Sequence, residues 1–86
     1  MALDLAFDDN GWEDYLWWQA NDRKVLARIN KLINEARRTP YSGLGKPEEL
    51  KYGSASTWSR RITSEHRLVY RVVDGNLVIL QARYHY

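Results

Sequence analysis

An apolar stripe that stops shortly before a proline is the sequence feature that most constrains the fold. The stripe repeats with the period of a helix, so its members share one helix face: Val25, Ile29, Leu32, Ile33 and Ala36. Asn21 and Asp22 can cap the start of this helix, because their side chains accept hydrogen bonds from its free N–H groups. Pro40 ends it, since proline lacks an N–H and its ring blocks the preceding turn. Such a helix needs a second layer to cover its apolar face.

The segments on either side of this helix predict further elements. Residues 3–7 alternate between apolar and other side chains, which is typical of a short strand. The capping-box pattern from Asn10 to Glu13 predicts a first helix. Residues 40–56 contain many glycine, proline and serine residues and are expected to form a loop, with a short strand near Leu50.

The last third of the chain has strand-like patterns that meet at a turn. Three segments favour strands: residues 58–62, 67–73 and 77–86. Asp74-Gly75 signals a hairpin, because glycine readily adopts positive φ. A turn on Gly75-Asn76 would reverse the faces, so both registers stay open. The order of elements predicts one α+β domain, residues 1–86, with an N-terminal strand and two helices packed on an antiparallel sheet.

Composition limits how such a small core is built. The chain has 86 residues and no cysteine, so neither disulfides nor thiolate metal sites stabilise it; four Trp, six Tyr and one Phe can fill the core instead. Trp17 and Trp18 point about 100° apart on a helix, so one of them is expected at a protein contact. No basic, apolar leader and no run of about 20 apolar residues is present, so we expect a cytoplasmic protein without a membrane association.

Charge is divided unevenly along the chain. Residues 1–22 carry a formal charge of −6, whereas residues 23–86 carry +8. This asymmetry favours a surface that binds a polyanion such as nucleic acid. The alternative is a solvated surface whose two halves attract each other.

The side chains present favour acid, base and cation chemistry. The sequence shows no zinc-ligand spacing, phosphate-binding glycine loop or nucleophile elbow, so no metal or cofactor is expected. Metal-free RNA cleavage needs a base for the 2′-OH, a cation for the phosphate and an acid for the leaving 5′-oxygen. Candidates for these tasks are Glu48 and Glu49 in the loop, Arg60, Arg61 and Arg67 on strands, and the tail Arg83-Tyr84-His85-Tyr86.

Each candidate also has a structural explanation. The glutamates can be solvated loop carboxylates, and the arginines can serve solubility, although strand alternation exposes at least one of Arg60 and Arg61 on the face without helices. In the tail, Tyr84 can stack on an unpaired base and Arg83 can pair with phosphate. The alternative is that the tail tyrosines complete the core, with His85 on the surface.

Five motifs in order carry a family resemblance. They are RRTP (37–40), GKPEELK (45–51), WSRRI (58–62), EHRLVY (65–70) and RYHY (83–86). Together they closely resemble the YoeB-type toxins of the RelE/ParE superfamily, over nearly the whole chain. The resemblance implies a RelE-like (microbial RNase-like) fold. It also implies a bacterial toxin that cleaves messenger RNA on the ribosome.

The resemblance assigns roles to particular residues. Glu48 is similar to the family's general base, His85 to its general acid and Arg67 to its phosphate-stabilising cation, while Tyr86 is similar to the residue that orients substrate or acid. Secondary contacts to RNA or the ribosome are implied for Lys46, Lys51, Arg61 and Glu65.

The same resemblance implies partners. These are an antitoxin of the YefM/Phd type with an acidic, flexible segment, a second copy of the toxin, and operator DNA only through the antitoxin complex. A folded binding module that represses transcription without cutting RNA remains the main alternative, and a nuclease that acts on free RNA is a weaker one.

Overall fold

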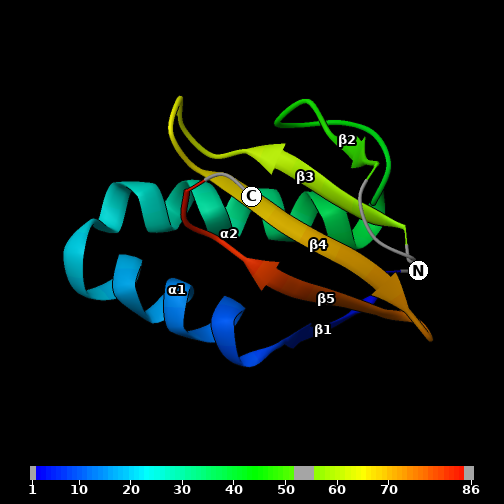
Figure 1. Ribbon diagram of the computed structural model, residues 1–86, viewed down its shortest axis with the longest axis horizontal. Coiled ribbons are helices and arrows are strands. Elements are labelled where there is room, and N and C mark those ends of the chain that lie inside the picture. The colour runs from blue at the N-terminus through cyan, green and yellow to red at the C-terminus, as the bar shows by residue number, and fades with distance from the viewer. Residues whose placement is uncertain (1, 52–55, 85–86) are drawn as a thin grey trace.

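The protein is a two-layer structure in which one sheet is backed by two helices (Figure 1). The computed structural model describes residues 2–51 and 56–84. The helices are α1 (Asp9–Asn21) and α2 (Arg23–Arg38). The strands are β1 (Asp4–Phe7), β2 (Glu48–Leu50), β3 (Thr57–Arg61), β4 (Arg67–Val73) and β5 (Asn76–Gln81). They lie in the order β1-β5-β4-β3-β2, so the predicted α+β fold is confirmed.

The sheet is antiparallel from β2 to β5, whereas β1 joins it parallel to β5. A parallel pair needs a long connection, and here the connection contains both helices and the other strands. In the β4–β5 hairpin Val73 pairs with Asn76, so Asp74 and Gly75 form the turn, with φ of 49° and 80°. Positive φ at both central residues suits a tight hairpin and settles the register that the sequence left open.

The two helices begin at aspartates. Asp22 caps α2 as predicted, because its Oδ1 accepts hydrogen bonds from the N–H groups of Lys24 and Val25, both at 3.1 Å. The predicted cap of α1 was wrong. Asp8 is extended and accepts the Gly11 N–H at 2.7 Å, whereas Asn10 is already helical and its amide donates to the Leu80 carbonyl.

The core lies between the helices and the inner face of the sheet. The α2 stripe is buried as predicted, apart from the half-buried Val25. It packs in one cluster with apolar side chains of β4 and β5: Leu68, Tyr70, Leu77 and Ile79. The neighbouring tryptophans have different surroundings: Trp18 is buried in this core and 5% exposed, whereas Trp17 is 38% exposed. Among the described residues, no helix has the length and apolar character needed to cross a membrane.

Strand alternation separates Arg60 from Arg61 as predicted. Arg61 is exposed on the open face of the sheet, whereas Arg60 is fully buried on the helix side. The Arg60 guanidinium donates to Tyr70 Oη at 2.9 Å and to the carbonyls of Leu44, Ser42 and Thr39. Arg60 therefore ties β3 and β4 to the loop that precedes β2.

Candidate active site

An acid and a cation meet on the open face of the sheet. Glu48 of β2 is the register partner of Ser59 in β3, and Arg61 in β3 is the partner of Arg67 in β4. Directly opposed residues share a face, and so do alternate residues of one strand. Glu48, Ser59, Arg61 and Arg67 therefore all belong to the face that the helices leave uncovered.

Arg67 is fixed by two side-chain hydrogen bonds. Its Nε donates to Ser59 Oγ at 2.9 Å, and its Nη2 donates to Glu48 Oε1 at 2.8 Å. The Arg67 side chain is 10% exposed and that of Glu48 is 59% exposed. Within the described residues, no hydrogen bond occupies Nη1 of Arg67. The arrangement is an oriented cation beside an accessible carboxylate, and a guanidinium has five N–H groups with which to bind such a carboxylate and a phosphate oxygen.

The loop before β2 sets the position of Glu48. Gly45 and Lys46 have φ of 87° and 52°, which turns the chain sharply toward β2. The Gly45 carbonyl accepts the Arg61 N–H at 2.7 Å, so this turn is attached to β3. Glu49 points elsewhere: its Oε2 accepts a hydrogen bond from Ser56 Oγ at 2.9 Å. Of the two candidate glutamates, Glu48 is the one that contacts Arg67.

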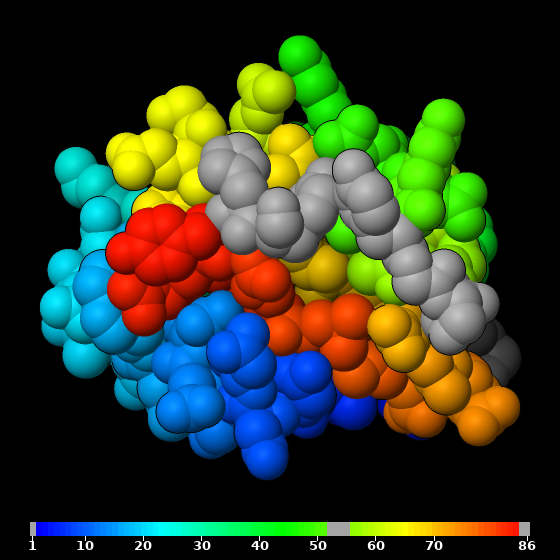
Figure 2. Space-filling model, in the orientation of Figure 1, coloured from blue at the N-terminus to red at the C-terminus, as the bar shows by residue number. Residues whose placement is uncertain are grey.

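The chain after β5 is held against α1. The Ala82 N–H donates to Asp14 Oδ2 at 3.0 Å, and Trp18 Nε1 donates to the Ala82 carbonyl at 2.7 Å. Figure 2 shows this part of the chain (red) between the surface of α1 (blue) and the connection after β3 (yellow). His85 and Tyr86, for which the resemblance implies the roles of acid and orienting residue, follow directly, and both lie outside the described residues.

The half-buried Arg83 lies between the exposed rings of Trp17 and Tyr84. The Arg83 guanidinium lies 3.9 Å from the centre of the Trp17 ring and 5.0 Å from that of Tyr84. Tyr84 is 56% exposed, so it does not complete the core. An exposed tyrosine beside a cation can stack on a base and attract its phosphate.

The other residues that are predicted to contact RNA or the ribosome lie on the surface. Lys46, Lys51, Arg61 and Glu65 are exposed. In residues 2–51 and 56–84, no side-chain hydrogen bond or ion pair links them to Glu48 or Arg67. The same ranges contain no cluster of three or more His, Cys, Asp or Glu side chains suited to a metal ion.

Four residues that support the site were not among the site candidates from the sequence: Asp14, Trp18, Ser59 and His66. Strand alternation could have found Ser59, because it shares a face with Arg61. No local pattern could have found the contacts of Asp14 and Trp18, which join α1 to residue 82.

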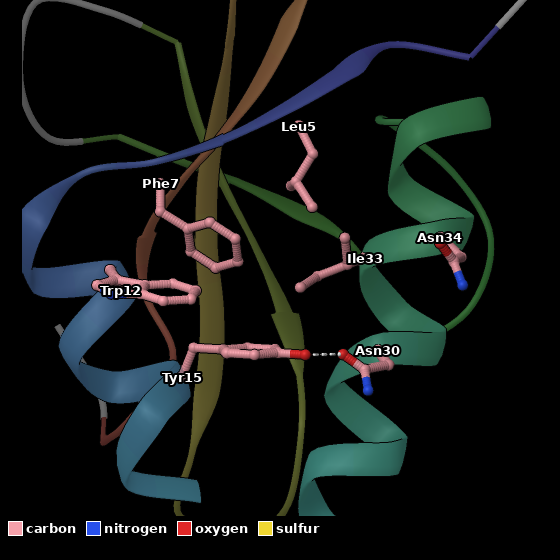
Figure 3. A pocket seen from close by; sticks show the side chains of 7 residues that line it. All are labelled: Leu5, Phe7, Trp12, Tyr15, Asn30, Ile33 and Asn34. Carbon is pink, nitrogen blue, oxygen red and sulfur yellow. Dashed lines mark hydrogen bonds between the residues drawn. The ribbon is translucent and has the colours of Figure 1, made fainter. Parts of the chain in front are cut away.

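A separate groove of about 520 Å³ lies between α1, α2 and β1. Phe7, Trp12 and Tyr15 supply its aromatic wall, and Tyr15 Oη donates to Asn30 Oδ1 at 2.8 Å (Figure 3). The remaining lining residues are Leu5, Ile33 and Asn34. None of the described residues that line this groove is charged, so they do not offer the acid, base and cation that RNA cleavage needs.

Comparisons with known proteins agree on one family. Residues 7–86 match the YoeB-like toxins of bacterial type II toxin–antitoxin systems. The toxin YoeB of Escherichia coli strain K12 is 51% identical over 84 residues, which cover 98% of this chain and all of that protein.

Two solved structures from Staphylococcus aureus share the fold over the whole length of both chains. One is a YoeB dimer, with 41% identity and a TM-score of 0.91. The other is a YoeB–YefM complex, with 40% identity and a TM-score of 0.87. The chain therefore belongs to the family of YoeB-like toxins of bacterial type II toxin–antitoxin systems.

Proposed function

We propose that this toxin is a ribosome-dependent endoribonuclease that cleaves messenger RNA in the ribosomal A site and so stops translation. The observation that carries the proposal is the contact between the accessible Glu48 carboxylate and the fixed Arg67 guanidinium, at 2.8 Å. These are two of the three groups that metal-independent cleavage needs. The third, an acid, is supplied by His85 of the tail.

Each group has one step in this reaction. Glu48 accepts the proton of the ribose 2′-OH, and that oxygen attacks the adjacent phosphorus. The bond from phosphorus to the 5′-oxygen breaks, and His85 donates a proton to that leaving oxygen. The products are a 2′,3′-cyclic phosphate and a free 5′-OH. Tyr86 orients the substrate or the acid.

Arg67 stabilises the charge that builds on the phosphoryl oxygens. Its guanidinium is already oriented by Ser59, so little reorganisation is needed when the charge develops. Two parallel N–H groups of arginine match the geometry of phosphate oxygens. The nearby Arg61, Lys46, Lys51 and Glu65 make secondary contacts with RNA or the ribosome, and Arg83 and Tyr84 bind a nucleotide by stacking and charge.

The same basic surface suits an antitoxin. We propose a YefM/Phd-type partner whose acidic, flexible segment folds over the toxin, and contact with operator DNA only through that complex. The S. aureus relatives were solved as a dimer and as a YoeB–YefM complex. A homodimer and a place in the bacterial cytoplasm belong to the same proposal.

Primer extension on a defined messenger RNA, with and without ribosomes, tests this function. Wild type should cut only when ribosomes are present, and folded His85→Ala should not cut. Cutting by His85→Ala at the wild-type rate would contradict the choice of acid. If folded wild type cuts in neither condition, the chain is a binding module and the proposed activity is wrong.

A further inference from the structure

Two consecutive residues, His66 and Arg67, connect the C-terminal tail to the cation and the base of the proposed active site. The Tyr84 N–H donates to His66 Nδ1 at 2.7 Å, and the Tyr84 carbonyl accepts the Arg67 N–H at 3.1 Å. The Arg67 side chain in turn holds Glu48 at 2.8 Å. We call the pair of bonds from residues 66 and 67 to Tyr84 the tail clip. The clip thus fixes one residue of the tail relative to the cation and the base.

His66 is itself held in place on three sides. Its ring meets Trp18 edge-on, with centroids 4.8 Å apart and planes at 87°, and lies 5.0 Å from the Tyr84 ring. Its own carbonyl accepts the N–H groups of Ile62 and Thr63 at 2.9 and 3.1 Å. The Nδ1 atom is thus the hydrogen-bond acceptor that the ring presents to Tyr84.

The backbone that the clip holds is unusual. Tyr84 has φ of 59°, in the left-handed region that residues other than glycine, asparagine and aspartate seldom adopt. Such a conformation persists only where surrounding contacts enforce it. Here both polar backbone groups of Tyr84 are bonded, to His66 just before β4 and to Arg67 at its first residue, so the chain has a defined direction at Tyr84.

We propose that His66 is a positioning residue for catalysis. Its Nδ1 fixes Tyr84 and thereby sets where the next residue, the acid His85, begins relative to Arg67 and Glu48. The proposal rests on the proposed nuclease function and extends it to a residue that does not touch the reacting atoms. The property of His66 that positions Tyr84 is the hydrogen-bond acceptor at Nδ1 and not the size of the ring.

Two matched variants separate the acceptor from the ring. In His66→Asn the amide Oδ1 can replace Nδ1, whereas in His66→Gln the oxygen is one bond further out, near the former Nε2. Both variants lose the ring contact with Trp18, so they share that structural cost. The assay is the ribosome-dependent cleavage reaction, with kcat and KM measured separately and Tm recorded for each protein.

We expect His66→Gln to lower kcat roughly 10- to 100-fold with little change in KM, because a small misplacement of a catalytic group has an effect of that size. His66→Asn should restore most of the rate. Amide hydrogen exchange at Tyr84 should be faster in His66→Gln than in wild type and His66→Asn, which reports on the clip without any cleavage.

Three results would overturn the inference. The first is a wild-type kcat for His66→Gln in an assay where wild type cuts. The second is an equal loss in both variants with a parallel fall in Tm, which would make the role purely structural. The third is unchanged exchange at Tyr84. If folded wild type never cuts, the proposed function fails first, and the exchange measurement still decides whether the clip exists.

Discussion

Arg60→Met is expected to lower the free energy of unfolding by about 3 to 5 kcal/mol, because several acceptors in the core would lose the charged donor to which they are bonded. Arg60 has no accessible surface, and its guanidinium donates four hydrogen bonds, to Tyr70 Oη and to the carbonyls of Thr39, Ser42 and Leu44. Methionine has a similar length but no donor, so these acceptors lose their partner.

The magnitude follows from the burial of those acceptors. A hydrogen bond to a charged group contributes about 1.5 to 3 kcal/mol, so four independent bonds would exceed the expected loss. The carbonyls lie on a partly buried loop and can regain water, and Tyr70 keeps its bond to the Pro40 carbonyl at 2.6 Å. These two effects reduce the cost to the expected range.

Urea unfolding followed by tryptophan fluorescence measures this loss, with Arg61→Met as the matched control. Arg61 is exposed, so its substitution should change stability by no more than about 0.5 kcal/mol. A stability for Arg60→Met within about 1 kcal/mol of wild type would refute the claim that the network stabilises the fold.

Two further predictions concern Tyr70 and Ser59. Burial raises the pKa of the Tyr70 hydroxyl above its ordinary value of 10.0, and the opposing bond from Arg60 is the smaller effect. Stability from this group is therefore full below pH 10 and lost as the pH rises through the folded pKa; urea unfolding should show this loss in wild type but not in Tyr70→Phe. Ser59→Ala removes the partner of Arg67 Nε and should lower the cleavage rate about 10-fold, and an unchanged rate would argue against orientation by Ser59.

Local patterns predicted the elements well where one pattern had one solution. The α2 stripe follows from its spacing alone, whereas the sequence left the cap of α2 and the hairpin register open, and the structure settles them as Asp22 and Asp74-Gly75. The cap of α1 could not be chosen, because Asp8 and Asn10 are both good capping residues and their tertiary contacts decide between them. The parallel pairing of β1 with β5 also has no local signal.

The candidate site was predictable in its residue types but not in its assembly. The family resemblance pointed to Glu48 and Arg67, and the structure brings these two together. The contacts that support them join residues far apart in sequence: Asp14 with Ala82 and His66 with Tyr84. Such contacts depend on how the strands pair, which hydrophobic periodicity does not specify.

The strand order has a consequence for how the molecule assembles. β5 lies between β1 and β4, although it is the last of the described strands to be synthesised. Until β5 emerges, β1 has no neighbour and α1 lacks the backbone against which Gly11 packs, where a Cβ would lie 2.2 Å from the Ile79 carbonyl oxygen. Pairing β1 with β5 closes a loop that contains both helices and the other strands, and closing so long a loop is entropically slow. The chain therefore cannot complete its sheet strand by strand during synthesis. The contacts that hold Ala82 against α1 therefore form only after β5 has left the ribosome.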